Sequence, residues 1–276
     1  AVTYITQRYA SLAAFFYLTA VVLYLKWRLT PSDAGNRSLW YAGALLSTVL
    51  AMKTKEITFT LPLMLLLVES IFFGSFTRKR WIALIPFLLT LAIIPLSPLP
   101  EGFGERGDFI ARETTAIGRT DYLLTQFSVI STYLRLLTLP VHQNLDYDYP
   151  IYHSLLEPKV FFSFLFLSAL LGLAFYLLFS SQRSTRSGPL KLIGFGLLWF
   201  FLTLSIESSI IPIEDVILEH RLYLPSVGFF LAASVSVLGL MDRQRRMKAI
   251  AIGVVVSVLC VATYRRNLIW KDELTL

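Results

Sequence analysis

Charged residues are scarce in this chain. Asp, Glu, Lys and Arg together make up only 16% of the 276 residues, whereas hydrophobic residues make up 55%. Soluble domains carry about 25% charged residues and cannot bury this much apolar surface in one core. The mean hydropathy of +0.64 agrees with this. The composition therefore predicts an integral membrane protein, with the lipid bilayer as a partner. The length of the chain allows roughly seven to nine membrane spans of ~20 residues.

Cysteine and the usual motifs of soluble enzymes are also missing. Cys260 is the single cysteine and lies in an apolar run, so no disulfide can form within the chain. The sequence has no His/Cys spacing typical of a metal site, no Walker loop, no GxSxG elbow and no dinucleotide-binding fingerprint. We therefore assign no metal ligands and expect neither an ATP-driven pump nor an enzyme with a soluble cofactor. Whether a substrate brings a divalent metal stays open.

Apolar segments that are long enough, or nearly long enough, to cross a bilayer occur eight times. They are 9–25, 39–52, 57–74, 81–97, 160–179, 190–204, 222–240 and 249–264. Several are shorter than ~20 residues and need snorkelling flanks or a thinned bilayer. The expected fold is all-α: a polytopic transmembrane helix bundle of about eight spans, forming one membrane domain.

The basic residues are distributed unevenly between these segments. Thirteen of the 25 Lys and Arg residues lie in four short loops, 26–37, 75–80, 181–191 and 242–248. The positive-inside rule places such loops in the cytoplasm, so the net charge of +7 requires no nucleic-acid partner. The other polar stretches, of which 98–159 is the longest, then face the periplasm of a bacterial inner membrane, or the lumen of the endoplasmic reticulum in a eukaryote.

The long outward segment contains one more expected helix, 121–139. Its apolar residues recur every three or four positions, and the opposite face carries Gln126, Ser128, Ser131 and Arg135. A single apolar stripe favours an interfacial or protein-packed helix over a lipid-exposed span. The alternative is a crossing whose polar stripe faces the interior of the bundle.

Lys53-Thr54-Lys55-Glu56 separates two apolar segments with almost no loop. Lys53 or Lys55 could hold a lipid phosphate at the interface, because an ammonium group is a strong point-charge partner for phosphate. Glu56 would then orient the lysine or the acceptor. The alternative is that the lysines are snorkelling cations that end a span.

Glu219, His220 and Arg221 stand together immediately before another apolar segment. Arginine binds phosphate through two hydrogen bonds, histidine transfers protons near neutral pH, and a desolvated glutamate can act as a base. These residues therefore form a second candidate site. The alternative is a salt bridge at the entry of a helix.

The stretch 142–150 carries Asp146, Tyr147 and Asp148. Its carboxylates and aromatic rings are suited to sugar hydroxyls and sugar faces, although a well-bonded turn ending at Pro150 would have the same composition. A lone acid near the cytoplasmic end of its segment, Glu69, is expected to reach the interface or to pair with Arg78 or Lys79, with a proton relay as the alternative.

Three short motifs give the chain a resemblance to a known family. They are Ala1–Arg8 (AVTYITQR), Lys53–Glu56 followed by Leu61-Pro62, and the EHRLYLPS string that starts at Glu219. In this order they resemble the membrane portion of bacterial proteins with tetratricopeptide (TPR) repeats. Those proteins are similar to the transmembrane-and-TPR O-mannosyltransferases of the GT-C glycosyltransferase superfamily.

The resemblance implies a GT-C-like enzyme. Such an enzyme moves a sugar from a polyprenyl-phosphate carrier, its donor substrate, to a hydroxyl of an acceptor protein on the outer face. It also implies a TPR domain beyond residue 276 and a catalytic acidic residue upstream of Ala1, so no catalytic residue is assigned within 1–276.

Glycosyl transfer from a lipid phosphate needs cations for the departing phosphate and a base for the acceptor proton. Arg221, Lys55 and Lys53 are the candidates for the phosphate. Candidates for sugar or acceptor contacts are Glu56, Asp146, Tyr147, Asp148, Glu219 and His220. The alternative function is non-catalytic: a flippase or transporter of lipid-linked sugars, or a membrane anchor for a TPR scaffold. A transporter should show internal repeats and midplane charges, and only Glu69 approaches that description.

Overall fold

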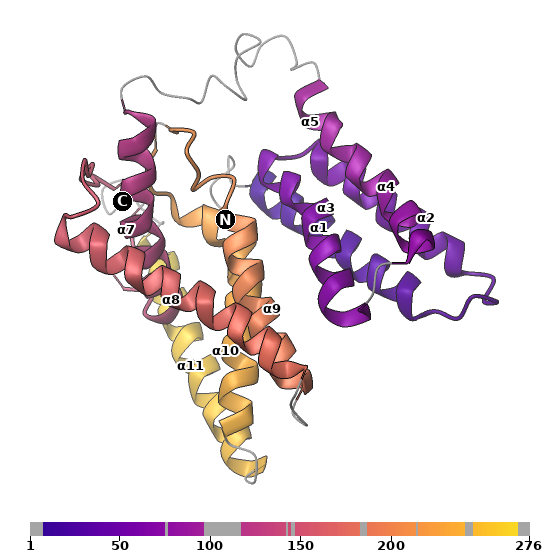
Figure 1. The fold of residues 1–276 in the computed structure, drawn as a ribbon. Helices are drawn as coiled ribbons and strands as arrows, with labels where there is room; N and C mark the ends of the chain where they lie inside the picture. Colours follow the sequence, from indigo (N-terminus) through magenta and orange to yellow (C-terminus); the bar gives the residue numbers. More distant parts are fainter. Residues whose placement is uncertain are drawn as a thin grey trace. The chain divides into compact units, whose positions relative to one another are not determined.

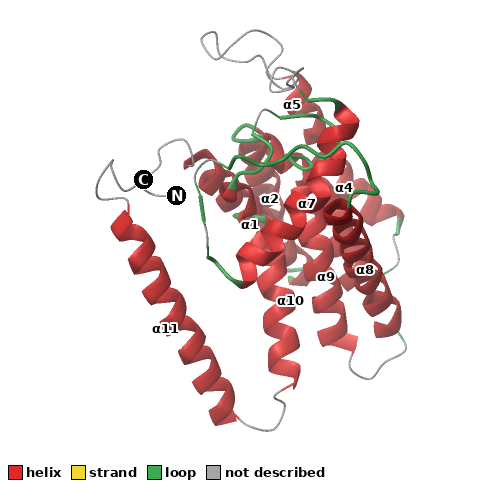
Figure 2. Ribbon diagram, turned by 90° about the vertical axis from the view of Figure 1, so that its left-hand side faces the viewer, coloured by secondary structure: helices red, strands yellow, loops and turns green. Residues whose placement is uncertain are grey.

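The described part of the chain is helical. The computed structural model describes residues 8–74, 77–96, 117–141, 143–144, 147–182, 187–213, 215–240 and 245–269. These ranges contain helices and loops but no β-strand (Figure 2). The all-α prediction is confirmed for this part of the chain.

Every apolar segment of the sequence coincides with a helix (Figure 1). The α-helices are α1 (Arg8–Leu29), α2 (Arg37–Met52), α3 (Leu61–Val68), α4 (Arg78–Leu89), α5 (Ile93–Leu96), α7 (Arg119–Thr138), α8 (Pro158–Ser181), α9 (Ser187–Leu204), α10 (Pro225–Leu240) and α11 (Arg245–Ile269). A 3-10 turn (Glu56–Thr60) precedes α3 and a π turn (Glu69–Phe73) follows it, which makes one continuous helical segment.

Four helical segments in the described ranges are long and apolar enough to cross a membrane. They are Arg8–Leu29, Glu56–Phe73, Pro158–Ser181 and Ser187–Leu204. The apolar parts of α10 and α11, Pro225–Gly239 and Ile252–Arg265, are shorter. At a rise of about 1.5 Å per residue, a helix of 16 residues such as α2 falls short of a bilayer core of about 30 Å. The structure thus supports a membrane protein, and the expected eight crossings reduce to four candidates by length and composition.

Proline and glycine set several helix ends. Pro62 and Pro158 lie in the first turns of α3 and α8, where a proline costs no hydrogen bond. Gly74 follows the π turn with a φ of +72°, a conformation that glycine adopts without a steric penalty. Glu157, the residue before Pro158, accepts hydrogen bonds from the main-chain N–H groups of His153 and Ser154.

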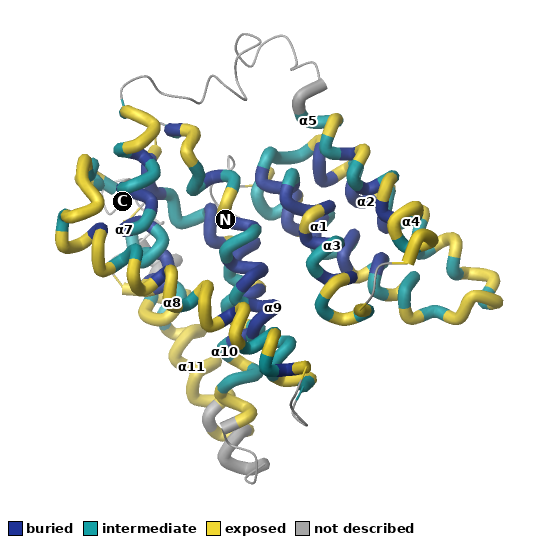
Figure 3. Tube along the Cα trace, in the orientation of Figure 1, coloured by how far each residue is buried: buried dark blue, intermediate teal, exposed yellow. Residues whose placement is uncertain are grey.

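The chain divides into two units, 1–232 and 233–276. The first unit contains two hydrophobic clusters. One gathers buried residues of α1, α2, α3 and α4, among them Tyr17 and Phe87, together with Trp199. The other gathers α7 and the segment after α9 around Tyr122 and Phe200. Trp199 and Phe200 are neighbours in α9, so this helix contributes to both clusters, and most of its residues are buried or half-buried (Figure 3).

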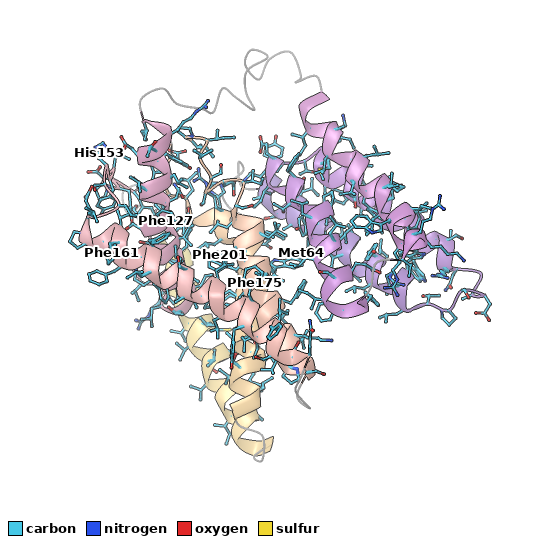
Figure 4. All side chains as sticks on the ribbon, in the orientation of Figure 1. Met64, Phe127, His153, Phe161, Phe175 and Phe201 are labelled. Carbon is cyan, nitrogen blue, oxygen red and sulfur yellow. The ribbon has the colours of Figure 1, made fainter. Side chains whose placement is uncertain are left out.

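Other helices expose long apolar faces. On α8, Phe162 and Phe175 are more than half exposed (Figure 4 labels Phe175). In the second unit, taken by itself, α11 exposes a run of valines from Val254 to Val261 (Figure 3). Exposed apolar patches of this extent mark protein or membrane contacts. On helices of this hydropathy, they fit contact with lipid.

Two glycines allow α9 and α10 to approach closely. A Cβ atom added at Gly228 would overlap the carbonyl oxygen of Gly196 and the side chain of Trp199. We therefore expect Gly228→Ala to destabilise the protein by about 1–3 kcal/mol through overpacking. Thermal melting in detergent, followed by circular dichroism, measures this. Gly172→Ala on α8 is the matched control, because its Cβ would meet nothing within 4 Å. Equal melting temperatures for the two variants would contradict the close contact.

Candidate functional site

A buried ion pair joins two of the segments singled out in the sequence. Lys55 follows the end of α2, and Glu207 lies in the turn after α9. The Lys55 Nζ and Glu207 Oε1 atoms are 2.5 Å apart, and the two side chains are only 12% and 9% exposed. The second carboxylate oxygen of Glu207, Oε2, is buried and has no hydrogen-bond partner among the described residues. The contact spans 152 positions of sequence.

Arg221 lies in the same region but is almost fully buried. Its guanidinium donates hydrogen bonds to the main-chain oxygens of Asp215, at 2.7 Å, and Val216, at 3.3 Å. The side chain therefore fixes the course of the segment before α10, and its charge acts on Glu207. Burial raises the pKa of Glu207, but Lys55 and Arg221 more than offset this, so the pKa lies below its ordinary value and the carboxylate is ionised at neutral pH.

His220 completes what we call the Lys55 cluster: Lys55, Glu207, His220 and Arg221. Burial, followed by the positive charge of Lys55, lowers the pKa of the imidazole from 6.5 to about 4. The imidazole is therefore neutral near pH 7, where it can accept a hydrogen bond.

This pKa leads to a testable dependence of stability on pH. Between about pH 6.5 and 4 the unfolded chain binds a proton at His220 that the folded chain does not, so folding stability should fall as the pH is lowered through this window. Melting temperatures measured from pH 7.5 to 4 should decline less steeply in His220→Gln. If the two curves have the same slope, the folded imidazole is not shielded from protonation as described.

Helix α7 packs against the main chain of the segments that carry the Lys55 cluster. Tyr122 donates its hydroxyl to the main-chain oxygen of Glu207, and Gln126 donates its amide to the main-chain oxygen of Val216, each at 3.0 Å. The Tyr133 hydroxyl bonds both the N–H and the carbonyl of Leu218. This face of α7 is therefore packed on protein.

Glu219 accepts hydrogen bonds from residues outside the Lys55 cluster. The Tyr147 hydroxyl donates to Glu219 Oε1 at 2.5 Å, and the main-chain N–H of Asn144 donates to the same oxygen at 2.8 Å. Burial and this carboxylate raise the pKa of Tyr147 to about 12. Two more of the predicted residues, Glu219 and Tyr147, are thereby brought together.

The remaining predicted site residues are not part of the Lys55 cluster. Asp148 and Lys53 are exposed, and Glu56 is half-buried at the start of the 3-10 turn. Asp146 lies outside the described residues. The sequence interpretation missed Glu207, although the signal was present: it is the first acid after the apolar segment 190–204.

A second buried charge cluster involves Glu69, which is fully buried. Its carboxylate accepts two hydrogen bonds from Arg28, both at 2.9 Å, and one from the Tyr24 hydroxyl at 3.0 Å. Arg80 lies 3.4 Å away. The predicted pairing with Arg78 or Lys79 is wrong: both are exposed, and the last turn of α1 supplies the partner instead.

The chain matches no protein-family model, no curated protein and no solved structure. Among the residues that the structure describes, no group of three or more His, Cys, Asp or Glu side chains is arranged to hold a metal ion.

Proposed function

We propose that this chain is the membrane part of a glycosyltransferase that moves a sugar from a polyprenyl-phosphate carrier to a protein hydroxyl. The observation that carries the proposal is the buried contact between Lys55 and Glu207. It joins the Lys53–Glu56 motif to the segment that leads into Glu219–Ser226, and these are two of the motifs on which the resemblance to the GT-C superfamily rests.

The contacts between loops support the sidedness that such an enzyme needs. Lys55 contacts Glu207, and Tyr147 contacts Glu219. The stretch 205–221 therefore contacts both other stretches that are assigned to the outer side by their charge. Arg28 and Arg80 belong to two of the basic loops, and both contact Glu69.

The chemistry of the Lys55 cluster suits a lipid phosphate. The departing carrier phosphate gains negative charge, and preorganised cations in a water-poor site stabilise that charge. Lys55 is the mobile cation of the cluster, since a flexible ammonium can exchange one anionic partner for another. Arg221 adds positive charge from a fixed position, because its own hydrogen bonds go to the main chain.

Glu207 gives Lys55 a resting partner. When a phosphate replaces Glu207 as the partner of Lys55, the carboxylate becomes available beside the neutral imidazole of His220. Glu207 is then the candidate to accept the proton of an acceptor hydroxyl, and His220 can accept a hydrogen bond. Tyr147, Asp148 and Glu219 remain candidates for sugar or acceptor contacts.

Binding of the bare carrier tests the proposal without knowledge of the sugar. Polyprenyl phosphate, added to the purified chain in nanodiscs of uncharged lipid, should bind and should bind at least tenfold more weakly to Lys55→Met, because one charge-assisted contact of roughly 1.5–3 kcal/mol is lost. Lys79→Met, which removes an exposed cation from a basic loop, is the matched control. Carrier binding that is absent, or unchanged in Lys55→Met, would contradict the proposal. Binding with no transfer of any labelled sugar by the full-length protein would favour a transporter.

A further inference from the structure

Helices α7 and α8 form a pocket that shares one lining residue, Tyr147, with the residues proposed for the transfer reaction. Its volume is about 500 Å³, in the range typical of sites for small ligands. Helix α7 contributes Ser131, Thr132 and Arg135 to the lining, and α8 contributes Lys159 and Ser163. Tyr149 closes one wall, where its hydroxyl bonds Ser128 at 2.7 Å and Thr132 at 3.1 Å.

The charges of this pocket have one sign. The described lining residues include two cations, Arg135 and Lys159, and no carboxylate. The nearest acid in the hydrogen-bond network, Glu219, accepts from the hydroxyl of Tyr147, another lining residue. Arg135 donates one hydrogen bond to the main-chain oxygen of Val141, at 3.1 Å. A guanidinium carries five N–H donors, so this bond leaves donors for a ligand.

Lys159 is held near the pocket by aromatic rings. Its Nζ atom lies 5.0 Å from the centre of the Tyr149 ring and 5.9 Å from that of Tyr152. Rings at this distance attract an ammonium through its charge, and an ammonium has three N–H donors, so it can contact an anion as well as the tyrosines. Cations, hydroxyls and a tyrosine wall together suit a phosphate that carries hydroxyl groups.

The position of the pocket along α8 indicates where that phosphate comes from. Lys159 is the second residue of α8, one of the four candidate spans, and therefore stands where that helix would enter the membrane. The exposed rings of Phe161 and Phe162 follow directly (Figure 4 labels Phe161). Basic and aromatic side chains at the end of a span lie at the level of the lipid headgroups.

We propose that the α7–α8 pocket binds the headgroup of an anionic glycerophospholipid, with Arg135 and Lys159 on its phosphate and the serine and threonine hydroxyls of the lining on its polar groups. This is a structural lipid site, separate in its residues from the Lys55 cluster.

The probe is phosphatidylglycerol, with phosphatidylcholine as the neutral comparison. Native mass spectrometry of the purified chain in mixed micelles should show preferential retention of phosphatidylglycerol. Arg135→Gln and Lys159→Gln should each weaken its binding about fivefold, the effect of one cation beside an anionic lipid surface. Lys159→Arg should retain binding. Lys79→Gln is the control cation outside the pocket, and circular dichroism verifies that each variant is folded.

Three results would overturn the proposal: equal retention of the two lipids, unchanged phosphatidylglycerol binding in the Arg135→Gln/Lys159→Gln double variant, or complete displacement of the lipid by millimolar glycerol 3-phosphate, which would make the ligand a soluble phosphate. The test is independent of the proposed transfer reaction. Lys55→Met should keep phosphatidylglycerol binding, and the double variant should keep binding of polyprenyl phosphate.

Discussion

Lys55→Met should lose about 3–5 kcal/mol of folding stability together with its affinity for polyprenyl phosphate. The substitution leaves the Glu207 carboxylate buried without its cation, and removing one partner of a buried ion pair has an effect of this size. The nearby charge of Arg221 remains, but its hydrogen bonds are directed to the main chain. Unfolding in a denaturing detergent, compared with the parent chain, measures the loss of stability.

The double variant Lys55→Met/Glu207→Met separates stability from function. Replacing both partners by apolar residues of similar volume is often neutral or stabilising, so the double variant should recover most of the stability lost in Lys55→Met. Binding of the carrier should stay lost, because the mobile cation is gone. If the double variant recovers carrier binding as well, Lys55 acts only through the fold and does not contact the phosphate.

Arg28→Met is expected to have the second large effect, a loss of about 3–5 kcal/mol with no change in carrier affinity among the folded molecules. Arg28 provides both short hydrogen bonds to Glu69, which is fully buried, and Arg80 at 3.4 Å replaces them only in part. The same unfolding measurement tests this.

Arg78→Met is the matched control for this variant. Arg78 is exposed, so its loss should change stability by no more than about 0.5 kcal/mol. Equal stabilities of Arg28→Met and Arg78→Met would show that the Glu69 cluster does not hold α1 to the segment Glu56–Phe73.

The positions of the helices could be predicted from the sequence, whereas their number of crossings could not. Each apolar segment forms a helix because its own composition leaves the backbone no other partner in an apolar environment. The length of an apolar segment is a weaker guide to whether it crosses the membrane. The segment 39–52 forms α2, yet α2 is too short by itself to be a candidate span. Position in the chain also favoured the wrong partners for Glu69, because Arg78 and Lys79 are closer in sequence than Arg28.

The candidate site was predicted in part. Lys55, His220 and Arg221 were singled out because their side-chain chemistry is unusual at the end of an apolar segment. Glu207 was not, because a single glutamate after a span has no local pattern and its partner lies 152 residues away. The burial of Arg221 could not be predicted from the sequence either, because it depends on the α7 residues that pack against the segment before α10.

Sidedness is the central claim, and labelling of single cysteines tests it most directly. In a Cys260→Ser background, Asp148→Cys and Ile210→Cys place exposed thiols on two stretches that we expect to face outward. Asp33→Cys and Arg78→Cys place exposed thiols on two of the basic loops. A maleimide that cannot cross the membrane should label the first two in intact cells and the last two only after permeabilisation. Labelling of Asp148→Cys and Ile210→Cys from opposite sides would contradict the shared site.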